Sequence, residues 1–132
     1  MNVFVWIAAI VLGATFLVAA VAKVRDQSGT VEGAVGLGVS ASVAPAVARV
    51  LPVLEAAGAL MVLTPPVRRY GAVVCLLLLA AFSIAIFKTL RAGRAPTCHC
   101  FGALSQRPID NSLLVRNAAL GLLAVAVLAG TP

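Results

Sequence analysis

Apolar residues of this chain gather into four long runs, which cover residues 3–22, 45–63, 70–90 and 112–129. The hydrocarbon core of a bilayer is about 30 Å thick, and about 20 residues of α-helix are needed to cross it. Each run approaches that length. The pattern therefore predicts an all-α fold, a four-transmembrane-helix bundle that forms one integral membrane domain over residues 1–132.

The composition supports a membrane protein. Hydrophobic residues make up 62% of the chain and charged residues 11%, whereas a soluble domain carries about 25% charged residues. A soluble protein of this size could not bury so much apolar surface. A disordered chain would be less hydrophobic and more charged. We therefore expect the lipid bilayer to surround this protein.

The net charge of +6 does not indicate a nucleic-acid partner, because the basic residues stand at the ends of the apolar runs, where lipid headgroups lie. Aromatic residues make up only 5% of the chain, so no surface for stacking bases is indicated. The first run ends in Ala20-Val21-Ala22, which imitates a signal-peptide cleavage site. No basic residue precedes this run, and it is longer than a signal-peptide core, so we expect it to remain as a span.

Residues 27–44 are rich in glycine and serine and separate the first two runs. We predict a short interfacial or re-entrant helix here, leading into Pro45, a residue suited to a first helical turn. Asp110 or Asn111 is expected to cap the last span. Because successive spans alternate in direction, the loops after the first and third spans share one side of the membrane. The termini and the turn at residues 64–69 share the other.

The strongest candidate for chemistry is the triplet Cys98-His99-Cys100. Two cysteines separated by one residue can close a strained ring, and strained, exposed disulfides are the labile and catalytic ones. The neighbouring His99 and nearby basic residues would favour the reactive thiolate. Cys75 lies about 22 Å from the end of the third span, so it cannot reach the triplet and is expected to be a buried apolar residue.

Two other interpretations of the triplet stay open. Two thiolates could hold Cu(I) or carry sulfur, whereas a zinc site would need ligands that one triplet cannot supply. A structural disulfide would close a loop too short to restrain much chain entropy. We favour the redox dithiol, with Cys98, Cys100 and His99 as catalytic residues and no resident metal.

Glu55 lies inside the second span, and an ionisable residue within a span indicates a functional site. The alternating topology brings other polar residues to the same side as Glu55 and the triplet. These are Lys23, Lys88, Arg116 and Asn117. We expect this supporting polar cluster to converge there, with Glu55 paired to Arg116 at similar depth. A purely structural pair is compatible with this arrangement.

The stretch Cys98-His99-Cys100-Phe101-Gly102, followed by Arg116-Asn117 at the head of the last span, resembles the methylamine-utilisation MauE family of membrane proteins. Leu51-Pro52-Val53-Leu54-Glu55 is similar to this family as well. The end of the first span is similar to the wider DoxX-like group, through Phe16, Ala20, Lys23 and Asp26. The resemblance covers nearly the whole chain.

The resemblance implies a four-helix protein of the bacterial cytoplasmic (inner) membrane that helps to form disulfides in an extracytoplasmic partner, together with a thioredoxin-like protein. Its layout is also similar to disulfide-generating membrane enzymes that pass electrons to quinone, and those often use two cysteine pairs. This chain has one pair on the active side, so a quinone is a candidate acceptor and no cofactor is certain. The sequence itself does not indicate methylamine.

Two arguments disagree about the side of the membrane on which the triplet lies. Six basic residues flank the loops on its side, against Arg68 and Arg69 on the other: Lys23, Arg25, Lys88, Arg91, Arg94 and Arg107. The positive-inside rule would place the triplet in the cytoplasm, where sulfur or metal handling would be favoured. The family resemblance implies the extracytoplasmic side, where disulfides persist. We expect the latter, because some of these basic residues can belong to the site.

The leading hypothesis is therefore a membrane thiol–disulfide oxidoreductase or disulfide-formation accessory protein. A non-catalytic membrane subunit or Cu(I) or sulfur carrier, using the same two cysteines, is the alternative.

Overall fold

The computed structural model describes residues 3–93 and 111–130, which form five α-helices and one 3₁₀ turn and contain no strand. The elements are α1 (Val3–Arg25), α2 (Gln27–Gly36), α3 (Ala44–Leu63), the turn η1 (Pro65–Val67), α4 (Arg68–Arg91) and α5 (Asn111–Gly130). Four segments are long and apolar enough to cross a membrane: α1, α3, η1 with α4, and α5 from Ser112. The predicted all-α bundle of four spans is confirmed.

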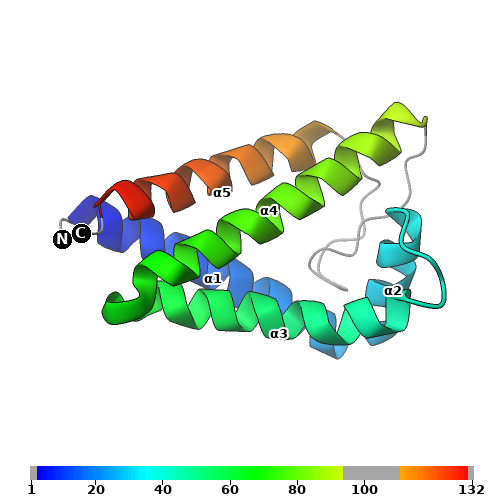
Figure 1. Ribbon diagram of the computed structural model, residues 1–132, viewed down its shortest axis with the longest axis horizontal. Coiled ribbons are helices and arrows are strands. Elements are labelled where there is room, and N and C mark those ends of the chain that lie inside the picture. The colour runs from blue at the N-terminus through cyan, green and yellow to red at the C-terminus, as the bar shows by residue number, and fades with distance from the viewer. Residues whose placement is uncertain (1–2, 94–110, 131–132) are drawn as a thin grey trace.

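Successive long helices run in opposite directions along the length of the bundle (Figure 1). α1 packs against α3 and α5, and α4 packs against both α3 and α5. Both termini lie at the end of the bundle where η1 joins α3 to α4, and α2 lies at the opposite end (Figure 1). α4 ends and α5 begins at the α2 end, so the predicted division of the loops between two sides is confirmed for the described helices.

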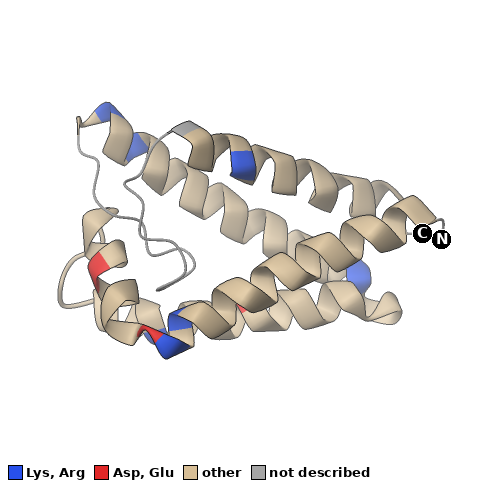
Figure 2. Cartoon of the chain, turned by 180° about the vertical axis from the view of Figure 1, so that it is seen from behind, with Lys and Arg blue, Asp and Glu red and all other residues tan. Residues whose placement is uncertain are grey.

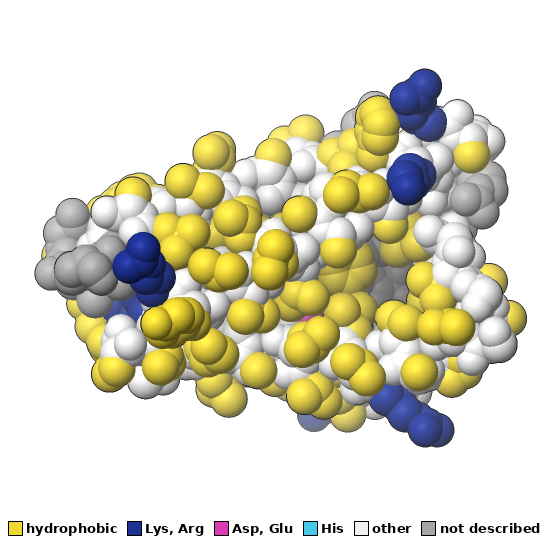
Figure 3. All heavy atoms as spheres, viewed as in Figure 1, with side chains coloured by type: hydrophobic (Ala, Val, Ile, Leu, Met, Phe, Trp, Pro, Cys, Tyr) yellow, Lys and Arg dark blue, Asp and Glu magenta, His cyan; other side chains and the backbone are white. Residues whose placement is uncertain are grey.

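The interior and the outside of the bundle are both apolar. The main core joins Leu12 and Phe16 of α1, Cys75 and Leu79 of α4 and Leu120 of α5, with small residues between them. Large apolar side chains such as Leu77 and Leu122 are exposed. Hydrophobic side chains cover most of the outer face seen in Figure 3. Charged residues gather toward the two ends, most of them toward the α2 end (Figure 2). This distribution is that of a protein surrounded by hydrocarbon rather than by water.

The short helix expected between the first two spans is α2. The Asp26 side chain caps its start by accepting a hydrogen bond from the Gly29 backbone N–H at 3.1 Å. A Cβ on Gly29 would lie against the Asp26 carboxylate, so a larger residue here would have to displace the capping side chain. The chain then turns through Gly38, at a φ of 103° that favours glycine. Pro45 lies in the first turn of α3, as predicted.

Close packing between α3 and α4 depends on Gly71. A Cβ at this position would meet the backbone of α3 at Met61 and Val62. Contacts of this kind let transmembrane helices approach closely and gain van der Waals attraction. Cys75 lies one turn further along α4 and is fully buried in the main core, so its predicted role as a small apolar residue is confirmed. The predicted cap at Asp110 and the side chain of Asn111 lie outside the described residues.

Candidate functional site

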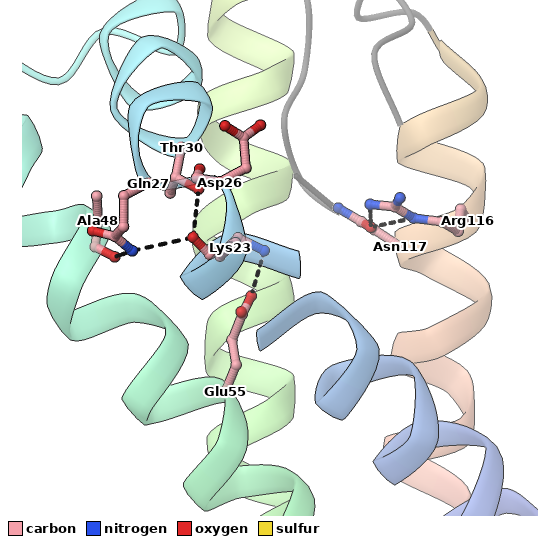
Figure 4. A network of polar contacts seen from close by, with 8 residues as sticks. All are labelled: Lys23, Asp26, Gln27, Thr30, Ala48, Glu55, Arg116 and Asn117. Carbon is pink, nitrogen blue, oxygen red and sulfur yellow. Dashed lines mark hydrogen bonds and ion pairs between the residues drawn. The ribbon is translucent and has the colours of Figure 1, made fainter. Parts of the chain in front are cut away.

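A buried ion pair lies inside the bundle near its α2 end. Lys23, in the last turn of α1, donates a hydrogen bond from Nζ to Oε1 of Glu55 on α3 at 3.0 Å (Figure 4). Lys23 is 2% exposed and Glu55 is 1% exposed. The ammonium also stands 5.5 Å above the Phe82 ring of α4. Neither charge would be tolerated alone in hydrocarbon, so each is held in the bundle by the other.

The second carboxylate oxygen of Glu55 accepts no hydrogen bond from the described part of the chain. Among the described residues, Oε2 of Glu55 is the buried side-chain polar atom that lacks a partner. A buried acceptor left unsatisfied costs about 1–3 kcal/mol. Exceptions of this kind in native proteins indicate a functional group or a site for a small bound molecule.

The Glu55 carboxylate borders a small cavity between α1, α3, α4 and α5. Its volume is about 30 Å³, and Thr15, Lys23, Arg116 and Asn117 contribute to the wall. A space of this size admits one water molecule. Three charged side chains and an amide therefore face a single site inside the spans.

The far wall of this cavity is built by α5. Arg116 donates from Nε and Nη2 to Oδ1 of Asn117, at 3.2 and 2.9 Å. Asn117 in turn donates from Nδ2 to Oγ of Ser83 on α4 at 3.2 Å. Asn117 is buried, and its amide thus fixes the Arg116 guanidinium and joins α5 to α4. Arg116 and Asn117 turn toward the Lys23–Glu55 pair in Figure 4.

The backbone of Lys23 is anchored by α2. The Lys23 carbonyl accepts hydrogen bonds from Nε2 of Gln27 at 3.1 Å and from Oγ1 of Thr30 at 3.3 Å (Figure 4). The Gln27 amide also donates to the Ala48 carbonyl of α3 at 3.0 Å. That carbonyl needs a donor because Pro52, four residues later in α3, has no backbone N–H. The proline inside α3 therefore opens an acceptor that ties α2 and the end of α1 to α3.

The predicted polar cluster forms in part. Lys23, Glu55, Arg116 and Asn117 surround one cavity, whereas Lys88 is exposed and borders a shallow surface hollow with Phe87 and Arg91. The prediction that Glu55 takes Arg116 as its partner is wrong, because the salt bridge of Glu55 is with Lys23. Depth in the membrane alone could not decide which cation pairs with Glu55, since Lys23, in the last turn of α1, also turns into the bundle.

The triplet Cys98-His99-Cys100 and the motif residues Phe101 and Gly102 lie outside the described residues. Their chemistry therefore stays a prediction. Within residues 3–93 and 111–130, no three potential metal-ligating side chains gather around one point.

Several site residues were not predicted from the sequence. Gln27, Thr30, Phe82 and Ser83 each contact the cluster, but polar and aromatic residues of these types occur without function in many helices. One signal could have found Gln27. Pro52 inside a span frees the carbonyl of Ala48, and a side-chain donor must be supplied from a neighbouring element.

Comparison with known proteins identifies a family. The family model described as "Methylamine utilisation protein MauE" matches residues 1–130. A curated relative, "Methylamine utilization protein MauE" of Paracoccus denitrificans, is 34% identical over 133 residues, which cover 96% of this chain and 69% of the relative. No solved structure matches.

Proposed function

The chain belongs to the MauE family, and from this premise we propose that it is a membrane component of methylamine utilisation that makes disulfides in a partner protein. Cys98 and Cys100 form the redox pair, and His99 acts as the base beside them. The partner is a thioredoxin-like or disulfide-bearing protein of the extracytoplasmic space. The protein acts either as the thiol–disulfide oxidoreductase itself or as its membrane accessory.

The observation that carries this proposal is the buried charge cluster at the α2 end. Lys23, Glu55 and Arg116 are costly inside a membrane, and such residues are rare unless they serve a function. They lie toward the end of the bundle where α4 ends and α5 begins, and the cysteine triplet belongs to the chain that joins these two helices. A cationic excess at this place supports the formation of thiolates nearby.

The proposed reaction is an exchange of two electrons. A partner dithiol attacks the Cys98–Cys100 disulfide, gives up two protons and leaves as a disulfide, and the two cysteines become thiols. Cys75 is buried in the core and cannot reoxidise them. Continued turnover therefore requires an external two-electron acceptor, for which we propose a membrane quinone.

We further propose the bacterial cytoplasmic membrane as the location, with the triplet on the extracytoplasmic side. The positive-inside count that opposes this orientation includes Lys23. Because Lys23 is buried against Glu55 rather than exposed at the headgroups, it leaves this count, and the buried Arg68 leaves the count of the other side for the same reason. Arg25, Lys88 and Arg91 remain exposed at the α2 end. The orientation that we propose therefore rests on the family and not on the basic residues.

The direct test is to count the thiols of the protein in isolated membranes. Denaturation in the presence of an alkylating mass tag should add one tag, at Cys75, to the oxidised protein and three tags after reduction. A Cys98→Ala, Cys100→Ala variant should take one tag in both states. Three tags on the oxidised wild type, without reductant, would remove the redox proposal. A membrane-impermeant tag applied to intact cells after reduction should label Cys98 and Cys100, and protection of both would reverse the proposed orientation.

A further inference from the structure

A second, larger cavity lies beside the ion pair. It has a volume of about 190 Å³ and opens between α2, α3 and α4. The hollow between α4 and the α2 end of the molecule is visible in Figure 3. Its wall is made of apolar side chains such as Leu51, Leu78 and Phe82, together with Thr30 and Lys23. Lys23 and Phe82 belong to the walls of both cavities, so the larger one is separated from Glu55 and Arg116 by these two side chains.

The size and lining of this cavity limit what it can hold. A cavity of roughly 150 Å³ with aliphatic and aromatic walls accommodates one benzene molecule. The cavity beside Lys23 therefore has room for one substituted six-membered ring. The wall is mostly apolar and is shared between the spans and α2, so it favours an apolar ligand of the kind that dissolves in a bilayer.

The charge in the wall further limits the chemical class of the ligand. Thr30 is engaged with the carbonyls of Asp26 and Lys23, at 2.8 and 3.3 Å. Lys23 is the charged residue in the described wall. An ammonium group is a hydrogen-bond donor without acceptor capacity, so it selects an oxygen acceptor on the ring. A saturated lipid chain offers no such acceptor.

We propose that this cavity binds the head ring of a membrane-dissolved quinone, with one ring carbonyl turned toward Lys23 and the ring packed against Phe82. The ligand class rests on the function proposed above, which needs an acceptor of two electrons. The quinone takes two electrons and two protons from the dithiol and becomes a quinol, while the dithiol becomes a disulfide. Lys23 and Arg116 together exceed Glu55 by one positive charge, and this excess stabilises the negative charge that builds on the ring during reduction.

Two alanines of α4 provide a matched pair of variants. Ala81 contributes to the wall of the cavity, and Ala80, its neighbour in the helix, does not. Both are exposed on the bundle surface, so a larger side chain at either position should leave the fold intact. Ala81→Phe fills the mouth of the cavity, and Ala80→Phe places the same ring on the outer face.

The experiment measures binding of decylubiquinone to the purified full chain in lipid nanodiscs free of quinone, by competition with a photoreactive azidoquinone. Ala81→Phe should raise the Kd at least about tenfold, and Ala80→Phe should change it by less than about twofold. Decyltrimethoxybenzene, which has a ring and tail but no ring carbonyl, should compete at least about tenfold more weakly than decylubiquinone. Equal binding by the two variants, or equal competition by the two compounds, would overturn the proposal.

The same measurement separates this proposal from the redox function. Decylubiquinone should bind equally to the wild type and to Cys98→Ala, Cys100→Ala, because the described wall contains neither cysteine. Carbonyl-dependent binding with no reversible disulfide would support quinone binding in the cavity and overturn the redox function. A reversible disulfide with no carbonyl-dependent binding would overturn only the proposal that the cavity binds a quinone.

Discussion

Two buried cations, one toward each end of the bundle, are satisfied in opposite ways. At the η1 end, Arg68 donates from Nε to the Val62 carbonyl at 2.7 Å and from Nη2 to the Leu63 carbonyl at 3.5 Å, and its guanidinium lies 4.1 Å from the centre of the Trp6 ring. Toward the α2 end, Lys23 faces the Glu55 carboxylate, one oxygen of which accepts no hydrogen bond from any residue in 3–93 or 111–130.

The difference suggests a structural role for Arg68 and supports the functional role that we propose for Lys23. Arg68 satisfies the last carbonyls of α3, which have no helical donor, and covers them with an aromatic ring. Lys23 brings a carboxylate into the membrane, borders two cavities and lies near a second cation, Arg116. A cation needed only for packing would not require these costs. We therefore assign the proposed function to the Lys23 end and a structural role to the Arg68 end.

The largest expected effect comes from breaking the ion pair. Glu55→Gln leaves Lys23 buried without a counter-charge, and we expect a loss of about 3–5 kcal/mol in the free energy of unfolding. Lys23→Met should cost a similar amount. The double variant should cost clearly less than the sum, because neither charge is then left alone. Unfolding in detergent measures all three, with the exposed Arg25→Gln as control. Simple additivity would show that the two residues are not coupled.

The next effect tests the other end. Arg68→Gln removes charged hydrogen bonds to α3 and the contact with Trp6, and we expect a loss of about 1.5–3 kcal/mol. The neighbouring Arg69 is exposed, and Arg69→Gln should change stability by less than about 0.5 kcal/mol. Equal stability of Arg68→Gln and Arg69→Gln in the same unfolding assay would remove the structural role of Arg68.

Close packing next to Arg68 gives a third prediction. Gly71→Ala places a methyl group against the α3 backbone at Val62, and we expect a loss of about 1–3 kcal/mol. Gly121→Ala is the matched control, because its Cβ would have Leu76 as its nearest neighbour at 3.8 Å, an ordinary contact. The thermal midpoint of the detergent-solubilised protein reports both. A stable Gly71→Ala variant would mean that α3 and α4 can separate at no cost.

The smallest effect concerns the support of Lys23 by α2. Thr30→Val removes the hydroxyl that donates to the carbonyls of both Asp26 and Lys23, at an expected cost of about 1 kcal/mol. Ser28→Ala, at an exposed position of the same helix, should change stability by less than about 0.5 kcal/mol. If the two variants unfold alike, α2 does not support the ion pair through Thr30.

Much of the fold could be predicted because the bilayer imposes a strong length rule. The number of spans, their approximate positions and the place of Pro45 followed from apolar runs and helix chemistry. The partner of Glu55 did not, because choosing between Lys23 and Arg116 depends on which way each helix turns its faces. The burial of Arg68 could not be predicted from the sequence either, since a basic pair beside a span usually indicates the headgroup region. Both outcomes depend on packing between helices, which no single run encodes.

The central claim is that the Lys23 end carries the function and the Arg68 end does not. Its most direct test is the rate at which each folded variant oxidises a partner dithiol in nanodiscs supplied with decylubiquinone. Lys23→Met with Glu55→Gln keeps the net charge of the site and leaves no orphan charge, yet it should lower the rate at least about tenfold. Arg68→Gln, compared at equal folded concentration, should stay within about twofold of the wild type. Equal rates for the two variants would contradict the assignment of function to the Lys23 end.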